Sequence, residues 1–305
     1  MKKIAIIIPT LNEEENIGRL IDSIKNASYK NKEIIVVDDG SKDRTVETAK
    51  KKGASVILNR PKKGGPAFCR NKGARYSDAE IICFLDADSL IEDKQFFARC
   101  LKEFEDKTVV AVYTSYKTIQ CTLLEKIVTL PKGISMEPKF IIASVFLKVG
   151  GFPEIGFGED QVLVERLREY EQEKGLREKV VSDAYFSGHG VHSLSEMYKQ
   201  AKWYGKTSVM FLSKIRKSLL KQFFRVYLRP IYFLSFVGTL LSLINSLFLV
   251  FLIPFILIFL SIILDSIKKR NPYSFGRTLT FLLFGLGMIH GLIISLFAVQ
   301  KGKGY

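Results

Sequence analysis

Short apolar runs alternate with longer amphipathic stretches over the first two-thirds of the chain. Four runs that each end at a polar residue are typical of strands buried on both faces of a sheet: residues 3–11, 33–39, 54–58 and 81–85. Residues 13–25 repeat isoleucine and leucine at helical spacing, which predicts a helix after the first strand.

The same alternation continues beyond the fourth run. It predicts further helices over residues 41–53, 91–105 and 160–175, and further strands over residues 108–114 and 179–185. Residues 121–139 follow neither period and contain Pro131 and Pro138, which predicts a solvated connector, or alternatively a segment lying on a membrane. This order of elements predicts an α/β fold, a mostly parallel sheet with helices on both faces.

The last third of the chain contains two long runs without a charge. They comprise 34 residues (231–264) and 23 residues (278–300), and each could cross a hydrocarbon core of about 30 Å. A single helix of the longer run would extend about 51 Å, so a hairpin turning near Asn245 and Ser246 fits better. Three membrane spans are therefore predicted, with two as the alternative. Three glycines of the last run favour close helix packing: Gly285, Gly287 and Gly291.

Charge divides along the chain in the same way. Of the formal net charge of +15, nearly all comes from residues 199–305, while residues 1–198 are almost neutral. Basic clusters beside apolar segments bind anionic headgroups, and residues 207–229 alternate bases with apolar residues, which predicts an amphipathic helix in the headgroup layer. An almost neutral head without a basic, aromatic-rich helix argues against nucleic-acid binding.

These patterns predict three parts: a head (1–206), an interfacial helix (207–229) and a transmembrane region (230–305). The first apolar run is too short for a signal peptide, so the head of a multi-pass protein in the cell membrane is expected in the cytoplasm. Four cysteines without CxxC spacing predict reduced thiols.

Carboxylates gather where the predicted strands end, at the edge where open α/β sheets bind ligands. Asp86 and Asp88 follow one strand, and two carboxylates at this spacing can share Mg²⁺ or Mn²⁺ with a bound diphosphate. Asp38 and Asp39 follow another strand and are expected to point outward into a nucleoside pocket. The sequence therefore predicts a metal-assisted nucleotide site.

A basic, glycine-rich loop, residues 59–75, leads towards the strand that ends at Asp86. Its glycines allow close backbone approach, and Lys63 and Arg70 could offset phosphate charge. The loop lacks the Lys-Ser/Thr ending of a P-loop and the GxGxxG spacing of dinucleotide sites, so neither fingerprint applies.

A second chemical centre lies further along the chain. A glycine-rich turn leads to Glu159 and Asp160 at the start of a helix, whose dipole stabilises acids there; one of them could take a proton from an acceptor hydroxyl. His189 or His192 could complete the metal coordination that Asp88 begins, although either could simply line a pocket.

Taken together, residues 4–206 resemble the family 2 glycosyltransferases, inverting enzymes of the Rossmann-like GT-A fold that use nucleotide-diphosphate sugars. The resemblance is carried, in order, by IPTLNEEENI, IIVVDDGSKDRT, GGPAFCRNKGAR, ICFLDADS and GGFPEIGFGED. It implies nucleoside contacts from Pro9, Asn12, Glu13, Asp38 and Asp39. It also implies that Arg70 contacts the nucleotide, that Asp86 and Asp88 contact the ribose, diphosphate and metal, and that Asp160 is the general base.

One segment departs from the family pattern. Processive members carry Gln-x-x-Arg-Trp, whereas this chain has Gln200-Ala-Lys-Trp203, one residue shorter and without the Arg. That departure argues against processive polymer synthesis. Trp203 is a candidate acceptor-binding residue, or it packs against its neighbours.

The resemblance implies a metal-dependent, membrane-bound enzyme that transfers a sugar to a hydroxyl of a lipid or lipid-linked acceptor. A phosphate acceptor is already ionised and needs no base, so a polyprenyl-phosphate glycosyltransferase of the dolichyl-phosphate type is the alternative within the family. A non-catalytic membrane scaffold that binds nucleotide sugars is the alternative from another class.

Overall fold

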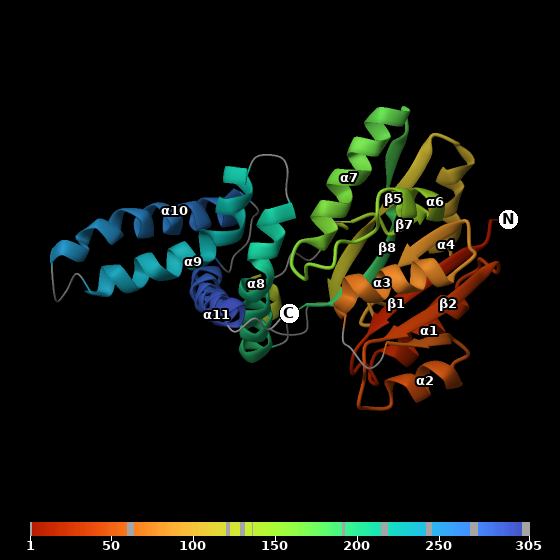
Figure 1. Cartoon of the computed structure of the whole chain (residues 1–305), viewed down its shortest axis with the longest axis horizontal. Coiled ribbons are helices and arrows are strands. Elements are labelled where there is room, and N and C mark those ends of the chain that lie inside the picture. The colour runs from red at the N-terminus through yellow and green to blue at the C-terminus, as the bar shows by residue number, and fades with distance from the viewer. Residues whose placement is uncertain are drawn as a thin grey trace. The chain divides into compact units, whose positions relative to one another are not determined.

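The computed structural model describes residues 2–59, 64–119, 123–128, 132–135, 137–190, 193–214, 219–241, 246–268 and 274–300. The chain forms two compact units (Figure 1). The first unit comprises residues 1–119 and 131–189, and the second comprises residues 120–130 and 190–305.

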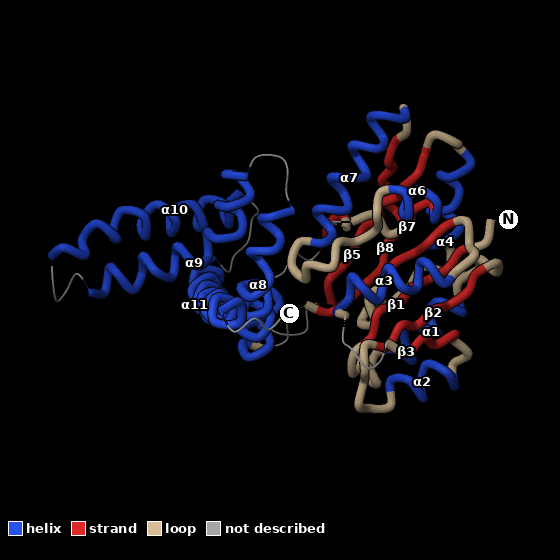
Figure 2. The backbone as a smooth tube through the Cα atoms, in the orientation of Figure 1, coloured by secondary structure: helices blue, strands red, loops and turns tan. Residues whose placement is uncertain are grey.

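The first unit contains an eight-stranded sheet (Figure 2). Its strands are β1 (Ile4–Thr10), β2 (Lys32–Asp38), β3 (Ser55–Leu58), β4 (Ile81–Phe84), β5 (Val109–Ile119), β6 (Lys132–Ile134), β7 (Phe140–Ile142) and β8 (Arg177–His189). The order across the sheet is β3-β2-β1-β4-β7-β5-β6, and β8 also pairs with β5. The strands β1 to β4 pair in parallel, and so do β5 and β8, whereas β7 is antiparallel to β4 and β5 and β6 is antiparallel to β5. The sheet is therefore mostly parallel, as predicted, with short antiparallel pairings at β6 and β7.

Helices cover both faces of this sheet, as predicted. They are α1 (Ile17–Asn26), α2 (Thr45–Lys51), α3 (Gly65–Tyr76), α4 (Phe96–Lys102), the 3-10 helix η1 (Glu103–Glu105), α6 (Ala143–Lys148) and α7 (Glu159–Lys174). Along β1, Ile4 and Ile6 pack with residues of α1 and α4, while Ile7 packs with residues of α3 and α7. This alternation follows from the two-residue period of a strand, and burying each isoleucine contributes about 1.5–3 kcal/mol.

The segment that leads into β7 differs from the solvated connector expected of it. Within its described residues, β6 pairs with β5, and Ser135 and Lys139 are only 7% and 4% exposed. The prediction was wrong because strands of three residues are too short to show a period, and a buried lysine looks like a surface residue in the sequence.

α7 buries a carboxyl group near its C-terminal end. Glu171 is 6% exposed, and its Oε1 has no hydrogen-bond partner among the described residues, as is also true of the Tyr113 hydroxyl and Glu178 Oε2. Burial, followed by the charge of Glu178, raises the pKa of Glu171 to about 7, although Arg168 opposes this. The fold therefore favours the neutral form of Glu171.

Replacing Glu171 by Gln is expected to stabilise the protein at high pH. The pKa of Glu171 is about 7 in the folded state, above its ordinary value of 4.5, so the folded state binds this proton more tightly than the unfolded state does. Protonated Glu171 therefore stabilises the fold below pH 4.5, and this stabilisation is lost as the pH rises through 7. After a discount for solvent screening, the gain in unfolding free energy should approach about 2 kcal/mol above that window. Urea unfolding of the wild type and the variant between pH 4.5 and pH 8 measures this gain. Glu173→Gln, at an exposed position of the same helix, is the control. A gain that does not grow with pH contradicts the raised pKa of Glu171.

The second unit is helical in its described residues. Its elements are α5 (Leu123–Val128), α8 (Leu194–Lys214), α9 (Leu219–Leu241), the 3-10 helix η2 (Ser246–Phe251), α10 (Leu252–Lys268) and α11 (Ser274–Gln300). The long uncharged run does not form one helix, because α9 ends at Leu241 and η2 begins at Ser246, close to the predicted turn. Of residues 207–229, those that the structure describes belong to the end of α8 and the start of α9.

Glycines allow the helices of this unit to approach one another. A Cβ atom on Gly291 would lie 1.9 Å from the carbonyl oxygen of Lys202 in α8, and one on Gly285 would lie 2.3 Å from that of Arg229 in α9. The close packing predicted for the glycines of α11 is therefore confirmed. Over the described ranges, no helix combines the length and the apolar character needed to cross a membrane.

Candidate active site

Arg70 connects the two chemical centres that the sequence separates by about seventy residues. Its Nη2 donates to Asp86 Oδ1 at 2.6 Å, and its Nη1 lies 3.4 Å from Glu159 Oε1. Asp86 follows β4, Arg70 lies in α3, and Glu159 begins α7. The carboxylate pair after the central strand and the acids of the glycine-rich turn therefore belong to one site.

Packing around α3 holds Arg70 in place. Its guanidinium lies over the ring of Phe152, 5.3 Å from the centroid. Phe152 is fixed in turn by Asn71, whose side chain accepts from the Phe152 N–H at 2.9 Å and donates to its carbonyl at 2.7 Å. Gly151 has a φ of +63°, and a Cβ atom there would lie 2.6 Å from Asn71 Oδ1, so this turn requires glycine.

The two acids at the start of α7 differ in their contacts. Glu159 pairs with Arg70, while Asp160 Oδ1 accepts from the Gln161 N–H at 2.9 Å. Burial raises the pKa of Glu159 to about 7 against the opposing charge of Arg70. Burial, followed by the charge of Glu137, raises the pKa of Asp160. Arg70 thus holds Glu159, and Asp160 is the better candidate base.

Asp86 and Asp88 have opposite electrostatic environments. Desolvation alone would raise the pKa of Asp86, but the charges of Arg70 and Lys139 lower it to about 2. Desolvation and the charges of Asp86 and Glu13 raise the pKa of Asp88 to about 6. Asp88 therefore lies among like charges, an environment that a divalent cation would relieve.

A complete metal site is not formed by the described side chains. Among them, no group of three or more His, Cys, Asp or Glu residues is placed to hold a metal ion. His192 lies outside the described residues, and His189 is described only as the last residue of β8. Asp88, with oxygen atoms and like-charged neighbours, fits a hard cation such as Mg²⁺ or Mn²⁺.

The carboxylates at the end of β2 do not point outward as expected. Asp38 is fully buried and accepts from the N–H groups of Gly40 and Ser41, and Asp39 is 6% exposed. Asp39 accepts from the N–H groups of Gly64 and Gly65, both at 2.9 Å. The expectation was wrong because these loops supply more N–H donors than the sequence pattern reveals, and the carboxylates turn inward to satisfy them.

The candidate nucleoside residues at the end of β1 lie in a loop that is hydrogen-bonded to the loop after β2. Asn12, at φ +57°, donates its N–H to Ser41 and accepts from the Lys42 N–H, both at 2.9 Å. The Glu13 N–H donates to Thr45 at 2.7 Å. Pro9 is partly buried in β1 just before this loop. The two loops therefore form one connected edge of the sheet.

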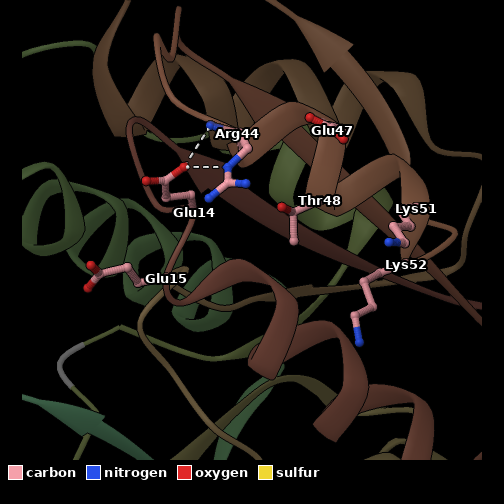
Figure 3. Close-up of a pocket in the computed structure, with 7 residues that line it drawn as sticks. All are labelled: Glu14, Glu15, Arg44, Glu47, Thr48, Lys51 and Lys52. Carbon is pink, nitrogen blue, oxygen red and sulfur yellow. Dashed lines mark hydrogen bonds and ion pairs between the residues drawn. The ribbon is translucent and has the colours of Figure 1, made fainter.

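A pocket of about 550 Å³ lies beside these loops (Figure 3). Charged side chains and one threonine line it: Glu14, Glu15, Arg44, Glu47, Thr48, Lys51 and Lys52. Glu14 accepts from the Arg44 N–H at 3.0 Å and pairs with its Nε at 3.5 Å. None of these seven residues belongs to the group joined by Arg70, so the pocket is separate from that site.

Comparison with known proteins identifies this part of the chain. Residues 5–153, nearly half of the sequence, match the family described as Glycosyl transferase family 2. This segment is similar to the family 2 glycosyltransferases. Within it lie β1 to β7, Arg70 and the two aspartates after β4, and the acids at the start of α7 follow immediately.

Two relatives of this domain are similar over short stretches. The poly(ribitol-phosphate) beta-N-acetylglucosaminyltransferase TarP of Staphylococcus aureus is 37% identical over 100 residues, 31% of this chain and 31% of that protein. The GalNAc(5)-diNAcBac-PP-undecaprenol beta-1,3-glucosyltransferase of Campylobacter jejuni is 37% identical over 93 residues, 29% of this chain and 30% of that protein. The chain thus spans about a third of the length of these relatives.

A solved structure shares the fold over a longer stretch. The mannosyltransferase PcManGT of Pyrobaculum calidifontis, in complex with GDP-Man and Mn²⁺, superposes with a TM-score of 0.57 at 16% identity, covering 97% of this chain and 87% of that one. At this identity the likeness concerns the fold alone.

Two residues of the first unit near this site were not predicted from the sequence. Lys139 is 4% exposed and donates to Glu137 at 2.5 Å, and its charge helps to lower the pKa of Asp86. The segment that carries both was expected to be solvated. The available signal was weak: a Glu-Pro-Lys immediately before an apolar Phe-Ile-Ile.

Two candidates remain as predictions. Trp203 lies in α8 of the second unit, is 38% exposed and has its ring 5.5 Å from that of Tyr204. Lys63 lies outside the described residues.

Proposed function

We propose that this protein transfers a sugar from a nucleotide-diphosphate sugar to a hydroxyl of a lipid or lipid-linked acceptor, with inversion at the anomeric carbon. The observation that carries the proposal is the bridge from Asp86 through Arg70 to Glu159, because it brings a nucleotide-binding edge and a candidate base into one site. The match to the glycosyltransferase family supports this chemistry. The mannosyltransferase structure that shares the fold holds GDP-Man and Mn²⁺.

Each residue of the site has its own role in the transfer. Asp160 accepts the proton of the acceptor hydroxyl as its oxygen attacks the anomeric carbon, and the bond from that carbon to the diphosphate oxygen breaks on the opposite side. Glu159 fixes Arg70, and Arg70 fixes Asp86 on the donor side. When bound, Mg²⁺ or Mn²⁺ held by Asp88 and a histidine would offset negative charge on the diphosphate.

A hydroxyl acceptor is favoured over a phosphate acceptor. A phosphate needs no base, whereas Asp160 has its carboxyl at the site and its pKa raised towards the working range of a base. The Campylobacter relative, whose name gives an undecaprenol-linked acceptor, supports a lipid-linked substrate. A polyprenyl phosphate is the competing acceptor in the test below.

Apolar exposure in the second unit supports action at a membrane. Several large apolar side chains of η2 and α10 are more than 60% exposed: Leu247, Val250, Ile253, Leu257 and Leu264. Such a surface favours contact with lipid. The full chain is expected to float with vesicles containing anionic lipid, and a chain that stays in the dense fraction at all lipid concentrations contradicts a membrane location.

The function is tested by release of nucleoside diphosphate. Purified protein is incubated with Mn²⁺, a nucleotide sugar and either a glycerolipid, a lipid-linked sugar or a polyprenyl phosphate. Release that depends on one of the first two acceptors and is abolished by EDTA is expected. Release with the polyprenyl phosphate alone supports the alternative acceptor, and no release with any donor and acceptor refutes the proposal.

The rate should depend on pH through Asp160. Because burial and then Glu137 raise the pKa of Asp160 above its ordinary 3.8, kcat should rise with pH through a midpoint above that value and fall as Asp160 is protonated. A pH–rate profile under saturating substrate measures the midpoint. A profile that is flat across the acid range contradicts the role of Asp160 as base.

A further inference from the structure

An ion pair between the buried Lys139 and the partly buried Glu137 lies beside the site and has no role in the transfer described above. Lys139 is 4% exposed, its ammonium donates to Glu137 Oε1 at 2.5 Å, and it lies 4.9 Å from the centre of the Phe186 ring. The Lys139 carbonyl accepts from the Phe84 N–H at 2.9 Å. The antiparallel pairing of β4 with β7 thus places Lys139 two residues from Asp86 along the edge of the sheet.

The two charges of this pair act on opposite sides of the site. The ammonium of Lys139 lowers the pKa of Asp86 on the donor side, where desolvation alone would raise it. The carboxylate of Glu137 adds to burial in raising the pKa of Asp160 on the side of the base. The register of β4 with β7 sets Lys139 beside the segment that carries Asp86, and in the proposed transfer the sugar lies between Asp86 and Asp160.

Stability alone does not account for this pair. Burying an ammonium and a carboxylate costs several kcal/mol per ion, and well-packed neutral residues often replace such pairs without loss. Among the described residues, the hydrogen bond between them uses one of three N–H groups of Lys139 and one of two oxygens of Glu137. The other N–H groups of Lys139 and the other carboxylate oxygen of Glu137 can therefore bind a ligand that has hydrogen-bond donors and acceptors on adjacent atoms.

We propose that Glu137 and Lys139 are specificity-determining residues that bind hydroxyl groups of the transferred sugar. A sugar hydroxyl can donate to Glu137 and accept from Lys139, which suits a paired anion and cation. This inference rests on the proposed function, because it places the sugar between Asp86 and Asp160.

The test compares nucleotide with nucleotide sugar. Isothermal titration in Mn²⁺ gives the Kd values of UDP, UDP-GlcNAc, GDP and GDP-mannose for the wild type and for a Glu137→Gln/Lys139→Met double variant. The double variant leaves no single buried charge, so it tests binding with little risk to the fold. The wild type is expected to bind one of the two pairs, UDP with UDP-GlcNAc or GDP with GDP-mannose. For that pair, the affinity of the double variant for the nucleotide sugar should fall about 10- to 100-fold, while its affinity for the nucleoside diphosphate should change less than about twofold.

Controls separate the outcomes. Lys148→Met, an exposed lysine of α6, should leave both affinities unchanged. Equal losses for nucleotide and nucleotide sugar, or no loss for either, overturn the inference. A wild type that binds none of the four ligands refutes the proposed donor class instead. If circular dichroism shows the double variant unfolded, Lys139→Arg takes its place: it keeps the charge but changes its geometry, so only the sugar-bearing ligand should bind more weakly.

Discussion

An Asp160→Asn enzyme is expected to transfer sugar about 10²- to 10⁴-fold more slowly than the wild type while it binds the donor with similar affinity. The amide keeps the size of the side chain and can still accept from the Gln161 N–H, as Asp160 does at 2.9 Å. It cannot take a proton from the acceptor. The loss should therefore appear in kcat, measured by release of nucleoside diphosphate, and hardly in donor affinity, measured by titration.

The controls for this variant come from the same helix. Glu173→Gln removes an exposed carboxylate of α7 and should leave kcat unchanged. Glu159→Gln should reduce the rate less than Asp160→Asn, because Glu159 acts through Arg70 rather than on the acceptor. If Asp160→Asn keeps its rate and Glu159→Gln loses it, the assignment of the base must be reversed.

Most strands of the first unit were predictable because they are apolar runs that end at a turn. β1, β2 and β4 match the expected runs, and the carboxylates after β4 lie at the expected edge. The antiparallel β6 and β7 were missed, since three residues carry no readable period. The pairing of β7 with β4 is nonetheless what brings Lys139 to the site.

The direction of a side chain was less predictable than its position. Asp38 and Asp39 end β2 as expected, yet both turn inward because the loop N–H groups around Gly40 and Gly64 need acceptors. A sequence pattern places a carboxylate at an edge but does not show which donors fold over it. The bridge through Arg70 was likewise invisible, because its partners Asp86 and Glu159 come from distant segments.

Replacing Arg70 by Met is expected to weaken both the reaction and the fold. The guanidinium side chain is 13% exposed and is the cation that contacts Asp86 and Glu159 in the described structure. Without it, Asp86 and Glu159 lose the cation that both contact. The loss should cost about 2–3 kcal/mol of unfolding free energy, which is below the usual cost of a broken buried pair because Asp86 is 46% exposed. Transfer should fall about 10²- to 10³-fold.

The pH dependence identifies the cause of that loss. Against desolvation, Arg70 and then Lys139 lower the pKa of Asp86 from its ordinary 3.8 to about 2. The stability that Arg70 supplies through Asp86 is therefore present above pH 3.8 and is lost as the pH falls through 2. The difference between wild type and Arg70→Met in urea unfolding should therefore shrink towards pH 2. Arg75→Met, exposed on the same helix, should show no such difference.

A double-mutant cycle separates the bridge from general packing on Phe152. Combining Arg70→Met with Asp86→Asn removes both charges, so the double variant should be more stable than the sum of the single losses by about 0.5–3 kcal/mol. Arg70→Lys keeps the positive charge, but an ammonium cannot contact two carboxylates in the way that the planar guanidinium does. Compared with Arg70→Met, this variant should regain part of the stability but little of the transfer rate. Additive losses in the cycle would mean that Arg70 acts through its contact with the Phe152 ring, and that the two halves of the site are held together by the fold alone.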